Sequence, residues 1–213
     1  MKTVLIGLGR IGWQYHLPQI VKHEGFELAA VVDTNPERLR EAEVAYGVRG
    51  YADAAEMLAK EAPELVVVAS PTVFHRQHAM DALRAGAHVF LDKPMACSLS
   101  EAREIVDRAR ACNRKLMVYQ PHRATAEAVA ARQVLESGLL GRVYMIRRAS
   151  NGYNRRADWQ AFEKNGGGML SNYGAHYIDQ LLYLTGGVPE EVRCWRMREV
   201  SLGDADDVVK VII

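Results

Sequence analysis

The sequence has no excess of charge of one sign and no long apolar run. Its formal net charge is +1 over 213 residues, so nothing in it points to nucleic acid or an anionic membrane as a partner. No apolar run approaches the ~20 residues that a membrane-spanning helix needs. The N-terminus also lacks the layout of a signal peptide, and these absences together favour a cytoplasmic protein.

Cysteine is scarce, and the sequence contains no internal repeat or low-complexity segment. Cys97, Cys112 and Cys194 share no metal-ligand spacing, and an odd number of cysteines cannot pair completely in disulfides. Reduced thiols are therefore expected, and no metal site is predicted. With 49% hydrophobic and 25% charged residues, the composition is that of a globular protein that can build a core.

A glycine-rich turn near the N-terminus is the most informative pattern. An apolar run at residues 2–6 is followed at once by Gly7-x-Gly9-x-x-Gly12. In a strand–turn–helix unit Gly7 permits the sharp turn, and Gly9 lets the backbone approach a pyrophosphate. Gly12 then lets the helix pack closely on the strand. The pattern predicts a dinucleotide site; the alternative is a plain strand–turn–helix with no ligand.

Two further features strengthen the dinucleotide interpretation. The first helical turn, with Arg10 and Ile11, offers free amide groups and the positive end of the helix dipole to phosphates. A second apolar run at residues 28–32 ends at Asp33, about 20 residues on, where the motif places an acid on the ribose hydroxyls. The alternative for Asp33 is a solvated cap.

Apolar runs of strand length alternate with helical segments up to about residue 121. The runs at 65–69, 88–91 and 116–119 are typical of strands buried on both faces of a parallel sheet. Helices are expected at 11–24, 36–45, 54–60, 72–85 and 100–113, the last capped by Ser100. This α/β alternation predicts a doubly wound parallel sheet, in which ligands bind beyond the carboxyl ends of the strands.

The pattern changes after residue 121. A long helix is expected at 124–137, a strand at 142–149, and a helix at 174–184 that follows Gly166-Gly167-Gly168. Apolar residues return at 192–200 and 208–213, where the chain stops in mid-strand. An apolar edge strand invites pairing, so a partner subunit or more protein is expected to cover it.

Two side chains are candidates for chemistry. Lys93 follows the strand at 88–91, and Pro94 restricts it to an extended backbone, so its amine could meet a substrate hydroxyl in the cleft. His176, three residues before Asp179, could take a proton near neutral pH. The alternatives are a surface lysine in a turn and a packed or surface histidine. His75 is expected to line the cofactor cleft.

In these residues the chain resembles a known family, the Gfo/Idh/MocA oxidoreductases, such as glucose–fructose oxidoreductase and inositol dehydrogenase. The matching motifs run in order along the chain: Gly7-x-Gly9-x-x-Gly12, Asp33, Ser70-Pro71-Thr72 with His75, residues 85–94 ending in Asp92-Lys93-Pro94, Gln120 with Arg123, and Gly166-Gly167-Gly168-x-Leu170-x-Asn172-x-Gly174-x-His176-x-x-Asp179.

The resemblance implies a Rossmann domain over residues 1–121 and a partial α+β domain, with an open, mainly antiparallel sheet, over residues 122–213. It implies hydride transfer between a nicotinamide cofactor and a hydroxyl or carbonyl carbon of a sugar, polyol or similar molecule, in a homo-oligomer. Lys93 matches the catalytic lysine and His176 the proton-transferring histidine. The cofactor-binding residues implied are Gly7, Gly9, Arg10, Ile11, Gly12, Asp33, Thr34, Ser70, Pro71, Thr72, His75, Asp92, Lys93 and Gln120.

NAD is favoured over NADP, because the carboxylate of Asp33 repels a 2′-phosphate and Thr34 offers no cation. Arg38, one turn into the next helix, is the residue that could oppose this preference.

The sequence departs from the family pattern at three points. Asp92 replaces a glutamate, and Asn172 stands where a carboxylate is expected in the catalytic set, so it cannot stabilise an imidazolium by charge. The chain also looks like a member cut short in its second domain. A non-catalytic dinucleotide-binding sensor, a degenerate member and a fragment of a normal enzyme therefore remain as alternatives to a complete dehydrogenase.

Overall fold

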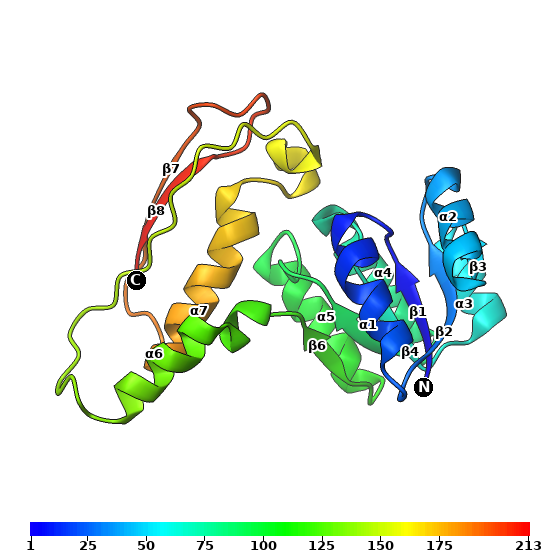
Figure 1. Cartoon of the computed structure of the whole chain (residues 1–213), viewed down its shortest axis with the longest axis horizontal. Helices are drawn as coiled ribbons and strands as arrows, with labels where there is room; N and C mark the ends of the chain where they lie inside the picture. The colour runs from blue at the N-terminus through cyan, green and yellow to red at the C-terminus, as the bar shows by residue number, and fades with distance from the viewer. The chain divides into compact units, whose positions relative to one another are not determined.

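The computed structural model describes residues 1–213, which form two compact units, Met1–Tyr119 and Gln120–Ile213. Figure 1 labels most of the helices and strands of both units. None of the helices combines the length and apolar character needed to cross a lipid bilayer.

The first unit is built on a six-stranded parallel sheet with the strand order β3-β2-β1-β4-β5-β6. The strands are β1 (Lys2–Ile6), β2 (Glu27–Val32), β3 (Arg49–Tyr51), β4 (Leu65–Val68), β5 (His88–Leu91) and β6 (Leu116–Val118). This is the order of a doubly wound dinucleotide-binding sheet, whose direction of winding reverses between β1 and β4. The predicted parallel α/β fold is confirmed, although β3 was not among the predicted strands.

Helices cover both faces of this sheet. They are α1 (Leu17–Lys22), α2 (Pro36–Tyr46), α3 (Ala54–Glu61), α4 (His75–Arg84) and α5 (Leu99–Ala111), with a 3₁₀ turn η2 (Thr72–Phe74) before α4. Val4 and Ile6 of β1 belong to one buried cluster, which includes residues of α3, α4 and α5. Leu5 points to the opposite face and joins residues of α1 and α2. Successive side chains of β1 thus pack into two hydrophobic cores, one on each face of the sheet.

The first helix differs from the prediction in its opening turn. Gly12–His16 form a π-helical turn, η1, and α1 continues from Leu17 to Lys22. Pro18 stands in the first turn of α1, where a residue without an N–H is tolerated. The single helix predicted at 11–24 is therefore divided into a π-helical turn and a short α-helix.

The cap of α5 is Ser98 and not Ser100. The Ser98 hydroxyl accepts a hydrogen bond from the Glu101 amide at 3.2 Å, and the Glu101 carboxylate accepts one from the Cys97 amide at 3.0 Å. The serine–glutamate spacing of a capping box is therefore present, and its cap lies two residues earlier than predicted.

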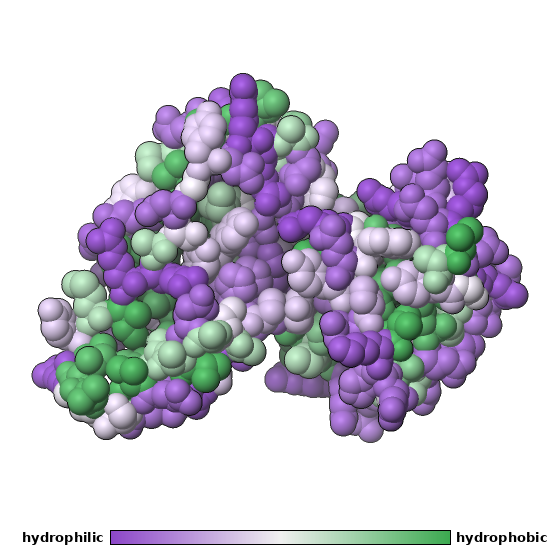
Figure 2. Space-filling model, viewed as in Figure 1, coloured by the Kyte–Doolittle hydropathy of each residue, from purple (hydrophilic) through white to green (hydrophobic).

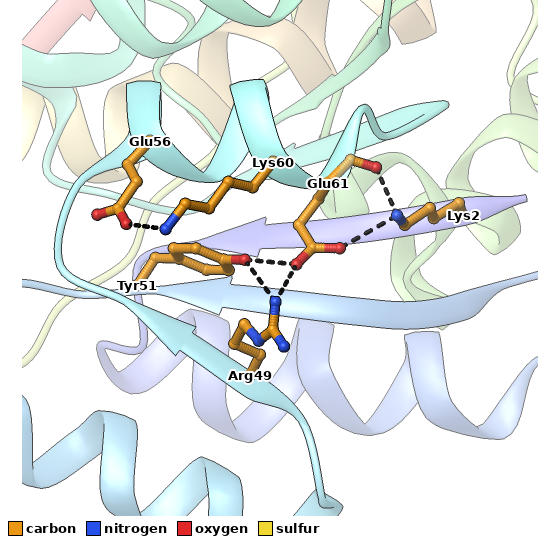
Figure 3. A network of polar contacts seen from close by, with 6 residues as sticks. All are labelled: Lys2, Arg49, Tyr51, Glu56, Lys60 and Glu61. Atoms are coloured by element: carbon orange, nitrogen blue, oxygen red, sulfur yellow. Dashed lines mark hydrogen bonds and ion pairs between the residues drawn. The ribbon is translucent and has the colours of Figure 1, made fainter.

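A polar network fastens the end of α3 to the sheet (Figure 3). The Glu61 carboxylate accepts a hydrogen bond from the Tyr51 hydroxyl at 2.5 Å and lies 3.1 Å from Lys2 Nζ. Arg49 Nη1 lies 3.7 Å from the same carboxylate. These contacts, with the Tyr51 hydrogen bond the largest cause, lower the pKa of Glu61. The carboxylate thus joins α3 to β1 and β3.

The second unit contains few regular elements. They are η3 (Pro121–Ala124), α6 (Ala126–Glu136), η4 (Trp159–Ala161), η5 (Glu163–Asn165), η6 (Leu170–Gly174), α7 (Ala175–Thr185) and the antiparallel pair β7 (Arg193–Met197) and β8 (Val208–Ile212). The predicted strand at 142–149 is wrong, because these residues form neither helix nor strand. The helix predicted from residue 174 begins earlier, in the π-helical turn η6, which runs into α7.

This unit buries little apolar surface. Its buried hydrophobic residues are three alanines, Ala128, Ala161 and Ala205. Figure 2 shows hydrophobic residues gathered over the far end of α6 and the segment after it, where Leu139, Leu140 and Met145 are exposed. Methyl groups of three alanines supply only a small part of the apolar burial that stabilises a domain.

Candidate functional site

The glycine turn between β1 and η1 is shaped by close backbone contacts. Gly7 has a φ of +99°, and a Cβ on it would lie 2.6 Å from the Ala69 carbonyl oxygen. A Cβ on Gly12 would lie 1.9 Å from the Gly7 carbonyl oxygen. Both glycines are thus required by the fold itself.

Gly9 is different, because a Cβ on it would meet no protein atom within 4 Å. The chain therefore does not itself require glycine at this position, which fits a requirement for close approach by a ligand. The next residues, Arg10 and Ile11, begin the first helical turn, where amide groups have no acceptor within the helix and can bind phosphate oxygens. The residues of the turn thus fit a pyrophosphate.

Asp33 lies at the carboxyl end of β2 and joins two loops. One of its oxygens accepts a hydrogen bond from the Leu8 amide at 2.8 Å, and the other accepts one from the Asn35 amide at 2.8 Å. Arg38 Nη1 lies 3.4 Å from the oxygen that binds Leu8. Thr34 beside it is exposed. The Asp33 carboxylate is therefore fixed beside the glycine turn, and the Arg38 guanidinium lies next to it.

The loop after β4 carries Ser70, Pro71 and Thr72. The Ser70 hydroxyl lies 3.0 Å from His78 Nδ1, and the Thr72 side chain is buried. His75, the first residue of α4, is almost fully buried, with Nε2 2.8 Å from the Ser70 carbonyl oxygen. Burial is the largest cause that lowers the pKa of His75.

The loop after β5 carries Asp92 and Lys93. The Lys93 amide donates a hydrogen bond to Asp92 Oδ1 at 2.7 Å, and the Lys93–Pro94 peptide bond is cis. His16, from η1, is buried with Nε2 3.7 Å from Asp92 Oδ2. Because β1, β4 and β5 are neighbours in the sheet, these loops all leave the same edge.

In the second unit, His176 lies in the first turn of α7. Its Nδ1 lies 3.3 Å from Gln120 Oε1, and its ring stacks on that of His122 with centroids 3.8 Å apart. Gln120 Nε2 also donates to the Ala175 carbonyl at 3.4 Å. The stretch that begins at Gln120 thus holds the start of α7.

Asn172 and Asp179 make different contacts. Asn172 Nδ2 donates a hydrogen bond to Gln160 Oε1 at 3.0 Å. Asp179 receives two hydrogen bonds from the Arg123 guanidinium, at 2.8 and 2.5 Å. A carboxylate engaged in this way by arginine serves to fix α7 on η3.

The structure brings the predicted residues together in two sets, each inside one unit. In the first unit they follow the carboxyl ends of β1, β2, β4 and β5: Gly7, Gly9, Arg10, Ile11, Gly12, Asp33, Thr34, Ser70, Pro71, Thr72, His75, Asp92 and Lys93. In the second unit, Gln120 lies beside His176, and Asn172 precedes it in η6.

The sequence interpretation missed two histidines. His16 was expected to be an ordinary helix histidine, yet it is buried beside Asp92. His122 was not singled out, although it stacks on His176. The only sequence signal for His122 was its place between Gln120 and Arg123, both already part of a motif.

The chain matches two family descriptions from end to end. A sequence model of the oxidoreductase family with an NAD-binding Rossmann fold, GFO_IDH_MocA, matches residues 1–133. A second model, for the GFO/IDH/MocA C-terminal domain, matches residues 128–213.

Individual relatives agree with these matches. The chain is 30% identical over 190 residues to D-glucoside 3-dehydrogenase of Escherichia coli K12, covering 87% of this chain and 54% of that protein. It is 26% identical over 198 residues to scyllo-inositol 2-dehydrogenase (NADP⁺) of Bacillus subtilis 168, covering 90% of this chain and 53% of that protein. The chain therefore spans about half the length of these relatives.

A solved structure shares the fold. The WlbA dehydrogenase from Bordetella pertussis, in complex with NADH and UDP-GlcNAcA, superposes with a TM-score of 0.87 at 29% identity, covering 99% of this chain and 65% of that one. The motifs at the strand ends, the two family matches and this likeness agree, and the chain belongs to the Gfo/Idh/MocA oxidoreductase family.

Proposed function

We propose that the protein is a cytoplasmic NAD-dependent oxidoreductase that acts on a hydroxyl or carbonyl carbon of a sugar, polyol or similar small molecule. The observation that carries the proposal is the sheet edge of the first unit. There the glycine turn, Asp33 and Lys93 all follow the carboxyl ends of parallel strands. Relatives that act on a glucoside and an inositol support the substrate class.

The coenzyme-binding role falls to residues 1–121, and residues 122–213 contribute to substrate binding and to a dimer or tetramer. The glycine turn holds the pyrophosphate, and Asp33 accepts hydrogen bonds from the ribose hydroxyls with its remaining lone pairs. Ser70, Pro71, Thr72, Asp92 and Gln120 complete the set proposed to line the coenzyme, whereas both ring nitrogens of His75 face backbone carbonyls.

Lys93 and His176 carry the chemistry in this proposal. When an alcohol is oxidised, its carbon gives a hydride to bound NAD⁺, and the products are a carbonyl compound, NADH and one proton. The Lys93 ammonium donates a hydrogen bond to the reacting oxygen and stabilises negative charge on it. The His176 imidazole accepts the hydroxyl proton, and Asn172 helps to orient the substrate by hydrogen bonds.

NAD is the preferred coenzyme because the Asp33 carboxylate is fixed beside the glycine turn. The 2′-phosphate of NADP would bring negative charge to this carboxylate. Arg38 is already 3.4 Å from Asp33 and forms an ion pair with it.

Turnover on a panel of glucosides, inositols and nucleotide sugars, followed by the absorbance of the reduced nicotinamide, tests the function. Reduction of NAD⁺ by at least one member, abolished in Lys93→Met, is expected. Tight NADH binding by fluorescence with no turnover on any member would contradict the enzymatic proposal.

A non-catalytic dinucleotide-binding sensor is the second candidate, and Asn172 favours it. This residue stands where the family carries a carboxylate, and its amide is engaged by Gln160. Under this candidate, the Asn172→Asp variant binds NADH as the wild type does and gains no turnover. An increase in kcat in Asn172→Asp would instead show that the wild-type site is catalytic and that a carboxylate at position 172 makes it more active.

A further inference from the structure

His75 connects the two loops that leave β4 and β5. It is the first residue of α4, and its side chain is almost completely buried. Nδ1 lies 2.8 Å from the Pro94 carbonyl oxygen, and Nε2 lies 2.8 Å from the Ser70 carbonyl oxygen. Since β4 and β5 are neighbouring strands, the ring spans the gap between their loops.

The protonation state decides how many of these contacts are hydrogen bonds. A neutral imidazole has a single N–H and can donate to one carbonyl, whereas an imidazolium donates to both. Burial is the largest influence on the pKa of His75 and lowers it; the two carbonyls, the Asp92 carboxylate and the Met95 backbone act in the opposite direction. The other titratable ring nearby is His78, on the next turn of α4. The ring is therefore neutral near pH 7 and donates one hydrogen bond.

The Pro94 carbonyl is the acceptor that bears on function. It belongs to the residue that follows Lys93, and the Lys93 amide is itself bonded to Asp92 Oδ1 at 2.7 Å. The turn that carries the lysine side chain is thus fixed on one side by Asp92 and on the other by His75. Ser70, in contrast, lies in a loop that η2 and α4 already anchor.

We propose that His75 is a positioning residue for Lys93. Its Nδ1–H donates to the Pro94 carbonyl and holds the turn in the geometry that presents the lysine amine to substrate. This inference rests on the proposed catalytic role of Lys93. It assigns to His75 a contact with the chain beside the lysine in place of a contact with coenzyme.

Two amide side chains separate the two carbonyl contacts. Asparagine places an NH₂ group near the position of Nδ1, and glutamine places one near the position of Nε2. His75→Asn can therefore keep the bond to Pro94, while His75→Gln can keep the bond to Ser70. We expect kcat to stay within about tenfold of wild type in His75→Asn and to fall about 10²-fold in His75→Gln and His75→Phe, because small misplacement of a catalytic group has this effect.

The matched control is His88→Gln. His88 stands at the opposite end of β5, and its Nδ1 also bonds backbone, accepting from the Lys115 amide at 3.0 Å. This variant should keep wild-type kcat. NADH affinity, measured by fluorescence titration, should change less than threefold in all the His75 variants. Equal losses of kcat in His75→Asn and His75→Gln would overturn the inference. So would losses of kcat that parallel the loss of stability, measured as the midpoint of urea unfolding of each variant.

Nitrogen NMR of the histidine-labelled full chain gives a readout that does not depend on turnover. The expected result near pH 7.5 is a His75 ring with its proton on Nδ1, coupled to the Pro94 carbonyl. A proton on Nε2 would contradict the inference even if the enzyme is active. An inactive wild type with the Nδ1–H tautomer would instead remove the proposed function and leave the hydrogen bond in place.

Discussion

The imidazole rings of His122 and His176 lie face to face, with their centroids 3.8 Å apart and 7° between their planes. Backbone and side-chain contacts fix both ends of this pair. Gln180 Nε2 donates to the His122 carbonyl at 2.9 Å, and Gln120 Oε1 lies 3.3 Å from His176 Nδ1. The orientation of the His176 ring is therefore set by η3 and by its own helix, before any substrate binds.

The two rings have separable roles. His176→Asn removes the proposed proton acceptor and should lower kcat by 10²- to 10⁴-fold, the usual contribution of a general base. His122→Phe keeps a flat ring for stacking, so kcat should fall by less than about tenfold, since the stacked ring acts by position. Steady-state kinetics, with NADH titration as the control for coenzyme binding, measures both. A larger loss in His122→Phe than in His176→Asn would reverse the assignment.

The glycine turn allows stability and coenzyme binding to be tested apart. Gly9→Ala adds a Cβ that meets no protein atom within 4 Å, so unfolding free energy should change by less than about 0.5 kcal/mol. NADH affinity should nevertheless fall at least tenfold, about 1.4 kcal/mol, because the Cβ occupies the approach to the backbone. Gly12→Ala places a Cβ 1.9 Å from the Gly7 carbonyl oxygen and should lower the urea midpoint as well. Unchanged NADH affinity in Gly9→Ala would place the pyrophosphate elsewhere.

Coenzyme choice depends on the pair formed by Asp33 and Arg38. Arg38→Ala removes a cation that contacts the Asp33 carboxylate, so the preference for NAD over NADP should increase, by about threefold to tenfold in the ratio of kcat/KM. Asp33→Asn should shift the ratio toward NADP by a similar factor or more, because the repelling charge is gone. Both ratios come from initial rates with each coenzyme. A wild type that prefers NADP would contradict the assignment of Asp33.

The sequence predicted the parts of the fold that carry a local signature. β1, β4 and β5 are continuous apolar runs, because strands buried on both faces have no polar side to show. β3 was missed because Arg49 and Gly50 give no such run, and only pairing with β2 makes these residues a strand. The strand predicted at 142–149 was wrong for the opposite reason: alternation was present, but no strand of the chain pairs with these residues.

The site followed the same rule. The positions of the glycine turn and Asp33 at the carboxyl ends of β1 and β2 were predictable, because they depend on backbone geometry within one strand–turn–helix unit. The stacking of His122 on His176 depends on how α7 packs on η3, and the contact between His16 and Asp92 depends on sheet order. Spacing along the chain does not contain that information, so these histidines looked ordinary in the sequence.

The network around Glu61 gives a prediction about stability that is independent of catalysis. Tyr51 is buried, and its hydroxyl donates to Glu61 Oε1 at 2.5 Å (Figure 3). Tyr51→Phe keeps the ring in the core and removes this hydrogen bond to a carboxylate, which should cost about 1.5–3 kcal/mol of unfolding free energy near pH 7.

The cost of Tyr51→Phe should become smaller in acid. Because the pKa of Glu61 is lowered in the folded state, mainly by the Tyr51 hydrogen bond, the stabilisation is complete above the ordinary glutamate pKa of about 4.3 and is lost as the pH falls through the lower folded value. Urea unfolding of wild type and Tyr51→Phe at a series of pH values measures the difference. Phe90→Leu, which also alters an aromatic residue packed in the sheet core, serves as the control, and its cost should not depend on pH in this range. A cost of Tyr51→Phe that stays constant down to pH 3 would mean that the tyrosine hydroxyl does not act through the ionised Glu61 carboxylate.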